Sequence, residues 1–358
     1  MSSTELMTHS LAAEPPVRRK GVPRWLIVLV GGLIALAVVA VAAWSVSLPY
    51  FAFAPGPTRD VESLITVDGA PIEEADSELY MLTVSVGNQP VNIYEYVAAL
   101  LDPDIDLVKS DLVRPPEVSY EEYRERNENL MDESVNLAIY VALRHLGYDA
   151  TFTGDGMVVV ETVEGTPGDG ALQKDDVIVE IDGEPVALAS DGVAIIQSHR
   201  PGDTVVLTVR RGDGLISVPV TLVEHSEEPG AAMVGVLPDT LNLHYEFPID
   251  VRIDSSAAIG PSAGLAYSLG VVNALTPEVD ELNGYVVAAT GTINEDGEVG
   301  AIGGVRQKVL AAEMAGAEIV LVPAANYQEA VTAGAEVRLV PVGTLEDALA
   351  FLGELPPA

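Results

Sequence analysis

The sequence predicts an α+β fold that is interrupted by a β-rich inserted domain and preceded by one transmembrane helix. Residues 25–48 carry no charge and are mostly apolar, which suits a helix that crosses a bilayer. Apolar positions recur at steps of three and four in residues 135–146 and 262–275, as in amphipathic helices, whereas residues 79–86 and 247–253 are strand-like. The long stretch between these elements is rich in strand and glycine-turn signals.

The apolar run is expected to be an uncleaved anchor. It is longer than the core of about 7 to 15 residues that a cleaved signal peptide carries, although residues 40–42 (Ala-Val-Ala) leave cleavage open as an alternative. The basic flank predicts that residues 1–24 are a cytoplasmic tail and that the chain after residue 50 lies outside the cell membrane, as a single-pass protein. Four basic residues make up this flank: Arg18, Arg19, Lys20 and Arg24.

The charge balance excludes some partners. The chain has 54 Asp and Glu against 18 Lys and Arg, a formal net charge of −36 at pH 7, so nucleic acid is excluded as a partner. The 5 histidines show no metal-ligand spacing, and no Gly-x-x-x-x-Gly-Lys-[Ser/Thr] motif is present, so we expect no metal, no cofactor and no step driven by ATP. Because there is no cysteine, the anchor alone indicates export.

A serine stands at the start of one predicted helix. Gly260 and Pro261 break the preceding strand, and Ser262 then begins the helix, followed by Ala263 and Gly264. The unsatisfied N–H groups and the positive dipole end of a helix favour a developing oxyanion, so this serine is a candidate nucleophile, and Gly264 keeps the approach to it uncrowded. The alternative is that Ser262 only caps the helix.

A lysine near the start of a second predicted helix is the candidate base. Beyond the apolar run the chain has only three lysines, Lys109, Lys174 and Lys308. Burial of Lys308 would favour the neutral amine and bring its pKa from about 10.4 toward roughly 7 to 8, the range that a general base needs. Arginine cannot serve in this way. The alternative is an ordinary lysine whose stem snorkels to the surface. Its apolar neighbours in sequence are Val305, Val309, Leu310 and Ala312.

Together these two motifs resemble the proteolytic domain of Lon-type serine peptidases. The resemblance implies that Ser262 and Lys308 form a catalytic dyad and that Thr290 contacts the lysine. The alternative for Thr290 is a strand-end residue before a glycine turn. The family often has an acidic residue where this chain has Ile259, and the nearest carboxylate in sequence is Asp254. The matching stretches are residues 250–269, 288–293, 297–323 and 324–326.

The resemblance extends upstream. Ser119 and Glu122 form a predicted capping box, and residues 129–134 run into the helical pattern of residues 135–146. With the strand-like residues 79–86, they look like the part of a Lon-type domain that precedes the serine. We therefore expect the protease domain to be split. Its two parts are residues 61–150 and residues 227–352, the second carrying the catalytic residues.

The expected insertion, residues 151–226, resembles a bacterial PDZ domain. Such domains add a peptide strand to a sheet edge and hold its terminal carboxylate in backbone N–H groups. Asp155 stands where such domains usually have the loop that holds this carboxylate, and its negative charge would repel the carboxylate of a peptide terminus. The alternative is a small β domain that binds no peptide and serves only as a spacer or a docking unit. The candidate peptide-binding residues are Gly154, Gly156, Met157 and Val158, and the matching stretches are residues 156–163, 165–172, 175–186 and 200–212.

These features predict a membrane-anchored, ATP-independent Ser-Lys endopeptidase. It would face the cell exterior and cleave exposed or unfolded segments of secreted or membrane proteins, with the PDZ domain presenting them. Its partners would be polypeptide substrates and the lipid bilayer, and the resemblance implies a six-membered ring. The alternative function is a catalytically silent PDZ adaptor. Residues 49–60 are expected to be a linker and residues 353–358 a tail.

Overall fold

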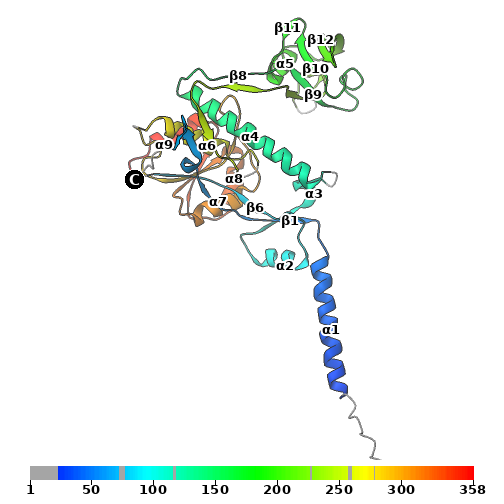
Figure 1. Cartoon of the computed structure of the whole chain (residues 1–358), viewed down its shortest axis with the longest axis vertical. Helices are drawn as coiled ribbons and strands as arrows, with labels where there is room; N and C mark the ends of the chain where they lie inside the picture. Colours follow the sequence, from blue (N-terminus) through cyan, green and yellow to red (C-terminus); the bar gives the residue numbers. More distant parts are fainter. Residues whose placement is uncertain (1–22, 72–76, 116–117, 226–227, 257–259, 278) are drawn as a thin grey trace, which may run out of the picture. The chain divides into compact units, whose positions relative to one another are not determined.

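The computed structural model describes residues 23–71, 77–115, 118–225, 228–256, 260–277 and 279–358. The chain divides into two compact units (Figure 1). The first holds the described part of Met1–Ala52 together with Val86–Pro115, and the second holds Phe53–Ser85 and Pro116–Ala358. The segment 61–150, expected as the first part of the protease, is therefore shared between them: residues 86–115 fold with the N-terminal helix.

The first unit begins with the predicted apolar helix, α1 (Arg24–Ser45). Its length and composition fit a membrane anchor. It ends before residue 48, the expected end, because the chain then pairs with the segment before α2 (Ile93–Leu101): Ser47 bridges Asn92, and Leu48 N–H donates to Val91 O at 2.8 Å. The unit also contains three short elements: the start of β1 (Tyr50–Pro55), β7 (Asp106–Lys109) and α3 (Ser110–Val113).

The second unit is built on a five-stranded sheet. Its strands lie in the order β2 (Arg59–Asp60), β5 (Glu78–Met81), β19 (Val286–Ala289), β22 (Ile319–Pro323) and β23 (Arg338–Val342). All neighbours in this sheet are parallel except β2 and β5. Parallel strands are stable where both faces are covered, and here helices cover both.

Alternate residues of this sheet face two separate cores. Val287 and Ala289 of β19 point to one core and Ala288 to the other, as the period of two in a strand requires. The first core is formed with α4 (Tyr120–His145), α6 (Gly264–Leu275) and α9 (Leu345–Gly353). The second is formed with α7 (Val305–Met314) and α8 (Tyr327–Val331).

Smaller strands and turns complete this part of the unit. The expected strand over residues 79–86 divides into β5 and β6 (Val84–Val86). A three-stranded sheet has the order β18 (Val251–Ile253), β3 (Ile65–Val67) and β4 (Ala70–Pro71). The remaining short elements are the hairpin of β20 (Thr292–Ile293) and β21 (Val299–Gly300) and the 3-10 turns η1 (Glu62–Leu64) and η2 (Ala324–Asn326).

The capping box predicted at Ser119 begins α4. The Ser119 side chain accepts from Glu122 N–H at 3.2 Å, and the Glu122 carboxylate accepts from Ser119 N–H at 2.8 Å. The helix then runs through both predicted segments to His145 and packs against α6. This brings the upstream part of the chain against the helix that follows Ser262.

The inserted β-rich domain has its own sheet and its own core. Its strands lie in the order β13 (Gly214–Thr221), β12 (Thr204–Arg211), β10 (Val177–Ile181), β9 (Met157–Thr162) and β16 (Val236–Thr240). The sheet thus extends past the expected end at residue 226, because β16 pairs antiparallel with β9. The other elements are β11 (Glu184–Pro185), α5 (Ala189–Gln197), β14 (Val223–Glu224) and β15 (Ala232–Met233).

The chain enters and leaves this domain along one two-stranded ribbon. β8 (Thr151–Thr153) pairs antiparallel with β17 (His244–Glu246), so Thr153 lies opposite His244. Paired entry and exit strands are the arrangement in which one domain inserts into another with little disturbance.

Candidate active site

Ser262 lies in the turn before α6. The helix begins at Gly264, two residues later than the sequence predicts, because Gly260 has a φ of +97° and Ala263, not Ser262, takes the N-cap position. No side chain caps this helix, so the alternative role of Ser262 as a cap is excluded. The Ser262 carbonyl is fixed instead, accepting from Gly291 N–H at 2.9 Å.

Lys308 reaches this turn from α7, on the other side of the sheet. Its Nζ lies 2.6 Å from Ser262 Oγ and 2.9 Å from Thr290 Oγ1. Thr290 is fully buried just after β19 and also donates to Ser262 O at 3.1 Å. The structure therefore brings together the serine, the lysine and the threonine that the sequence singles out.

Burial sets the protonation of this lysine. Lys308 is only 3% exposed, so its amine does not snorkel to solvent, and desolvation lowers its pKa to about 7. Among the described residues no carboxylate lies within 4.0 Å of Nζ to stabilise the ammonium. Position 259, where the family often has an acid, lies outside the described residues. A neutral amine next to a hydroxyl is the combination that base catalysis requires.

Backbone donors lie beside the serine hydroxyl. Within the described ranges, the N–H groups of Ser262 and Ala263 donate to no protein acceptor, whereas Leu265 N–H donates to Gly291 O at 3.1 Å. Unsatisfied amides at the start of a helix are suited to a carbonyl oxygen that becomes negative during attack on it.

Gly264 is required by close packing. A Cβ on Gly264 would lie 2.9 Å from the backbone N of Ile293 and 3.1 Å from Ser134 Oγ. The sequence suggested that Gly264 leaves room at the serine. In the structure, the missing side chain lets α6 approach β20 and α4.

Three residues that sequence reasoning did not assign to the site hold its loops in place. Ser134 Oγ donates to Pro261 O at 3.0 Å, and Asn127 O accepts from Gly260 N–H at 3.2 Å, so α4 fixes the serine-bearing turn. Asn326 accepts from Ile302 N–H at 2.8 Å and donates to Ile302 O at 3.1 Å, which fixes the loop before α7. Of these three residues, the sequence could have pointed to Ser134, because it is a polar residue on the apolar face of a predicted helix.

The predicted peptide-binding residues of the inserted domain lie where no strand edge is free. Met157 is buried, and Val158 pairs both with Val177 of β10 and with Asp239 of β16. Gly156 has a φ of +122°, and a Cβ on Gly154 would lie 2.7 Å from Ala187 O, so the preceding loop is closed by packing. This position therefore offers a peptide no edge to join; in the part of the chain that the structure describes, β16 is the sheet edge next to it and pairs with no strand on its outer side.

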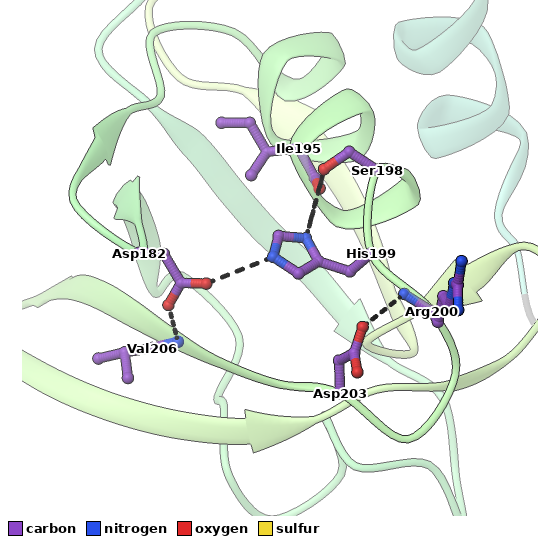
Figure 2. Close-up of polar contacts among 7 residues, drawn as sticks. All are labelled: Asp182, Ile195, Ser198, His199, Arg200, Asp203 and Val206. Carbon is purple, nitrogen blue, oxygen red and sulfur yellow. Dashed lines mark hydrogen bonds and ion pairs between the residues drawn. The ribbon is translucent and has the colours of Figure 1, made fainter.

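The inserted domain contains a second serine beside a basic side chain (Figure 2). His199 Nδ1 lies 3.4 Å from Ser198 Oγ, and its Nε2 lies 3.5 Å from Asp182 Oδ2. However, Ser198 Oγ donates to Ile195 O at 2.7 Å, and His199 Nδ1 lies 2.9 Å from the same carbonyl. Nδ1 must carry a hydrogen to make that bond, so it has no lone pair for the serine proton. This group lacks the features of a hydrolytic triad.

No group of three or more His, Cys, Asp or Glu side chains suited to a metal occurs among the described residues.

Two domain families match the chain. Residues 240–349 match the Lon protease (S16) C-terminal proteolytic domain, and residues 141–222 match the PDZ domain. The resemblances to a Lon-type proteolytic domain and to a PDZ domain are therefore confirmed, as is the mixed helix-and-strand fold that contains both.

Among characterised proteins, the chain is similar to Lon proteases. It is 38% identical over 96 residues to Lon protease 2 of Bacillus subtilis, covering 26% of this chain and 16% of that one. It is 34% identical over 125 residues to Lon protease of Clostridioides difficile, covering 33% and 14%. The chain thus spans less than a fifth of the length of either relative. A solved PDZ domain of an SdrC-like protein from Listeria monocytogenes is 26% identical, covering 24% of this chain and 87% of that one, with a TM-score of 0.22.

Proposed function

We propose that the chain is a membrane-anchored serine endopeptidase in which Ser262 is the nucleophile and Lys308 the general base. The observation that carries the proposal is the 2.6 Å contact between Lys308 Nζ and Ser262 Oγ, made by an amine whose pKa burial lowers to about 7. The similarity of residues 240–349 to a Lon-type proteolytic domain supports the same reaction.

In this reaction the neutral Lys308 amine accepts the Ser262 hydroxyl proton as Oγ attacks the scissile carbonyl carbon. The N–H groups of Ser262 and Ala263 stabilise the oxyanion of the tetrahedral intermediate. The Lys308 ammonium then returns its proton to the leaving amine nitrogen, which departs as the C–N bond breaks and leaves an acyl ester on Oγ. Lys308 then deprotonates a water that attacks this ester, and it returns the proton to Oγ as the C–O bond breaks, which releases the carboxyl product and restores the Ser262 hydroxyl.

The threonine orients the base. Because Thr290 Oγ1 donates its hydrogen to Ser262 O, it presents a lone pair to Lys308 Nζ. One amine hydrogen is thereby directed to Thr290, and the nitrogen lone pair is left for the hydroxyl of Ser262.

The proposed substrates are exposed or unfolded segments of secreted or membrane proteins. The chemistry consumes only water and the peptide bond, so we assign no ATP-driven step to it. Ser262 is partly exposed and Lys308 behind it is buried, so a substrate segment must bring its peptide bond down to this turn, which favours extended, unfolded polypeptide. Assembly into a six-membered ring stays a prediction from the family resemblance, and light scattering in detergent would measure it.

The PDZ domain is proposed to present substrates by strand addition. The edge that supports this is β16, which is unpaired on its outer side and exposes Leu237. Pro238 in this strand lacks an N–H, so an added peptide gains one donor fewer than on a regular edge.

The proposed location is a single-pass membrane protein with its N-terminus in the cytoplasm and its catalytic part outside. The basic flank of α1 supports this orientation. Because the chain has no cysteine, Leu215→Cys on the exposed surface of the PDZ domain gives one labelling position. A membrane-impermeant maleimide should label it on intact cells; labelling only after lysis would reverse the orientation.

Labelling with a serine-directed fluorophosphonate probe tests the enzyme against the alternative, a silent PDZ adaptor. The wild-type protein should be labelled and Ser262→Ala should not, while Ser198→Ala, which removes the exposed serine beside His199, should label like the wild type. Equal labelling of all three proteins, or of none, would favour the adaptor.

A further inference from the structure

We propose that α2 is an interfacial helix whose apolar face lies in the outer surface of the lipid bilayer, beside the point where α1 leaves it. The inference rests on the proposed role of α1 as a membrane anchor. It assigns a lipid contact to a segment that the sequence interpretation placed in the protease domain. The apolar face of α2 would contact the headgroups and the upper acyl chains of a zwitterionic bilayer.

One side of α2 is apolar and uncovered. Val97 is 48% exposed, Leu100 64% and Leu101 80%, and Ile93 is also exposed. These positions follow the spacing i, i+4, i+7 and i+8, which gathers them on one face of a helix. Ala99, the buried residue of the helix, lies on the opposite side. In water such a face is costly, and a soluble protein rarely leaves it open.

The contacts of α2 with α1 fix its depth. Tyr94 Oη donates to Ala40 O at 3.0 Å, and the rings of Tyr94 and Trp44 lie 6.5 Å apart. Ala40 comes five residues before the last residue of α1, which is about 8 Å along a helix that rises 1.5 Å per residue. A segment held there lies at the boundary of the hydrocarbon if α1 spans it. Trp and Tyr side chains are enriched at that level.

The connection between the two helices holds α2 close to the membrane. The chain that leaves α1 pairs with the residues just before α2, through the Ser47 and Asn92 bridge and the bond from Leu48 N–H to Val91 O. In Figure 1, α2 lies across the axis of α1. A helix across the axis of a spanning helix runs along the bilayer surface, as interfacial helices do.

The shape and charge of this region favour lipid. An apolar depression lies between the two helices, lined by Ala40, Val41, Trp44 and Tyr94. It opens beside the spanning helix, where lipid is the neighbour. The charged residues in α2 and in the turn that follows it, Glu95, Asp102 and Asp104, are acidic, so we expect contact with a zwitterionic surface and no gain from anionic lipid.

Depth-dependent fluorescence of the full chain tests the proposal. Leu101→Cys, with a polarity-sensitive nitrobenzoxadiazole label, would be compared with Leu215→Cys, whose side chain is 67% exposed in the PDZ domain. Both proteins would be reconstituted in phosphatidylcholine vesicles. We expect blue-shifted emission at position 101, strong quenching by a lipid with a nitroxide near its headgroup, and iodide quenching at least 5-fold weaker than at position 215. Leu100→Cys repeats the measurement should the first variant misfold.

Flotation of the same samples distinguishes failure of the α2 lipid contact from failure of the α1 anchor. If the protein floats with the vesicles but iodide quenches positions 101 and 215 alike, α2 does not contact lipid and the anchor still stands. If the protein does not float, the anchor fails and this inference with it. A label shielded from both quenchers, in proportion to protein density, would show that another protein surface covers α2 and would overturn the lipid contact.

Discussion

The two serine-containing groups of this chain have similar partners and opposite environments. In the protease domain, Ser262 Oγ lies next to the amine of Lys308, which is 3% exposed and also contacts the hydroxyl of Thr290. In the PDZ domain, Ser198 stands beside His199, with Asp182 on the far side of the ring, but the hydroxyl and Nδ1 both contact one backbone carbonyl. Residue types alone would favour the second group as a hydrolase, since Ser, His and Asp recur in such sites.

The difference between the two groups is whether the nitrogen next to the serine has a free lone pair, which a general base needs to accept the serine proton. Burial lowers the pKa of Lys308 to about 7, and its Nζ lies 2.6 Å from Ser262 Oγ. At His199 the nitrogen that faces the serine must carry a hydrogen for the Ile195 carbonyl. The four predictions below test this difference, from the largest expected effect to the smallest.

Replacing Lys308, the proposed base, should abolish turnover. Lys308→Arg keeps the positive charge but cannot lose it near neutral pH, so we expect peptide hydrolysis to fall by about 10³-fold or more. In the wild type, kcat should rise with pH through about 7 as the neutral amine replaces the ammonium. Steady-state hydrolysis of an unfolded fluorogenic polypeptide measures both. Lys174→Arg at an exposed site is the matched control, and substantial turnover by Lys308→Arg would make the lysine a structural cation.

Removing the buried amine should stabilise the protein at low pH. The folded state binds the Lys308 proton only below about 7, whereas the unfolded chain binds it up to its ordinary value of 10.5. Between these values the unfolded state holds more protons, so wild-type stability rises with pH across this window. Lys308→Met lacks this dependence. Near pH 6 it should be more stable by up to about 5 kcal/mol, a gap that largely closes by pH 10.

Denaturant melts at several pH values measure the difference, with Lys174→Met as the control at an exposed lysine. A constant gap between Lys308→Met and wild type from pH 6 to pH 10 would mean that the amine stays protonated in the folded state.

The sequence predicts the residues of the site but not what holds them. Ser262 and Lys308 each lie in a short local pattern, and the family resemblance adds Thr290, so all three could be selected without a structure. The bond from Ser134 to Pro261 joins residues 127 positions apart, and no local pattern marks such a contact. Likewise, α6 begins at Gly264 because the turn before it is fixed from α4, which propensity alone does not show.

The sequence predicted the fold of the PDZ domain but not which strand lies at the edge of its sheet. Its strands follow regular alternation, but β16 comes after a separate strand pair and joins the sheet beside β9. Met157 and Val158 are candidates because they stand in the place of the usual carboxylate loop, and a peptide strand added there would need β9 to be an edge. Strand order is set by long-range pairing, so alternation in a single sequence does not determine which strand lies outside.

Removing the threonine hydroxyl should weaken catalysis without abolishing it. Thr290→Val is nearly isosteric but loses the acceptor for Lys308 Nζ and the donor to Ser262 O. We expect kcat to fall by about 10 to 100-fold. Because the ammonium loses an acceptor, the pKa of Lys308 should fall further, and the rise of kcat should move to lower pH.

Thr290→Ser, which keeps the hydroxyl, should stay within a few-fold of wild type and keep its pH profile. A purely structural threonine would give the opposite pattern: kcat would follow stability in both variants, and the midpoint of the pH profile would not move.

The smallest effect is expected in the PDZ domain, where the serine and histidine lack catalytic geometry. Ser198→Ala and His199→Gln should each leave peptide hydrolysis within twofold of wild type, because Nδ1 of His199 donates to Ile195 O and cannot take a serine proton. Both side chains lie near the surface, so stability should change by no more than about 0.5 kcal/mol. Hydrolysis at a fixed low substrate concentration is the sensitive measurement, since it also reports weakened presentation by the PDZ domain. A loss above about 10-fold in both variants, with Ser262 intact, would mean that the exposed group takes part in the chemistry and that burial of the base is not the deciding difference between the two groups.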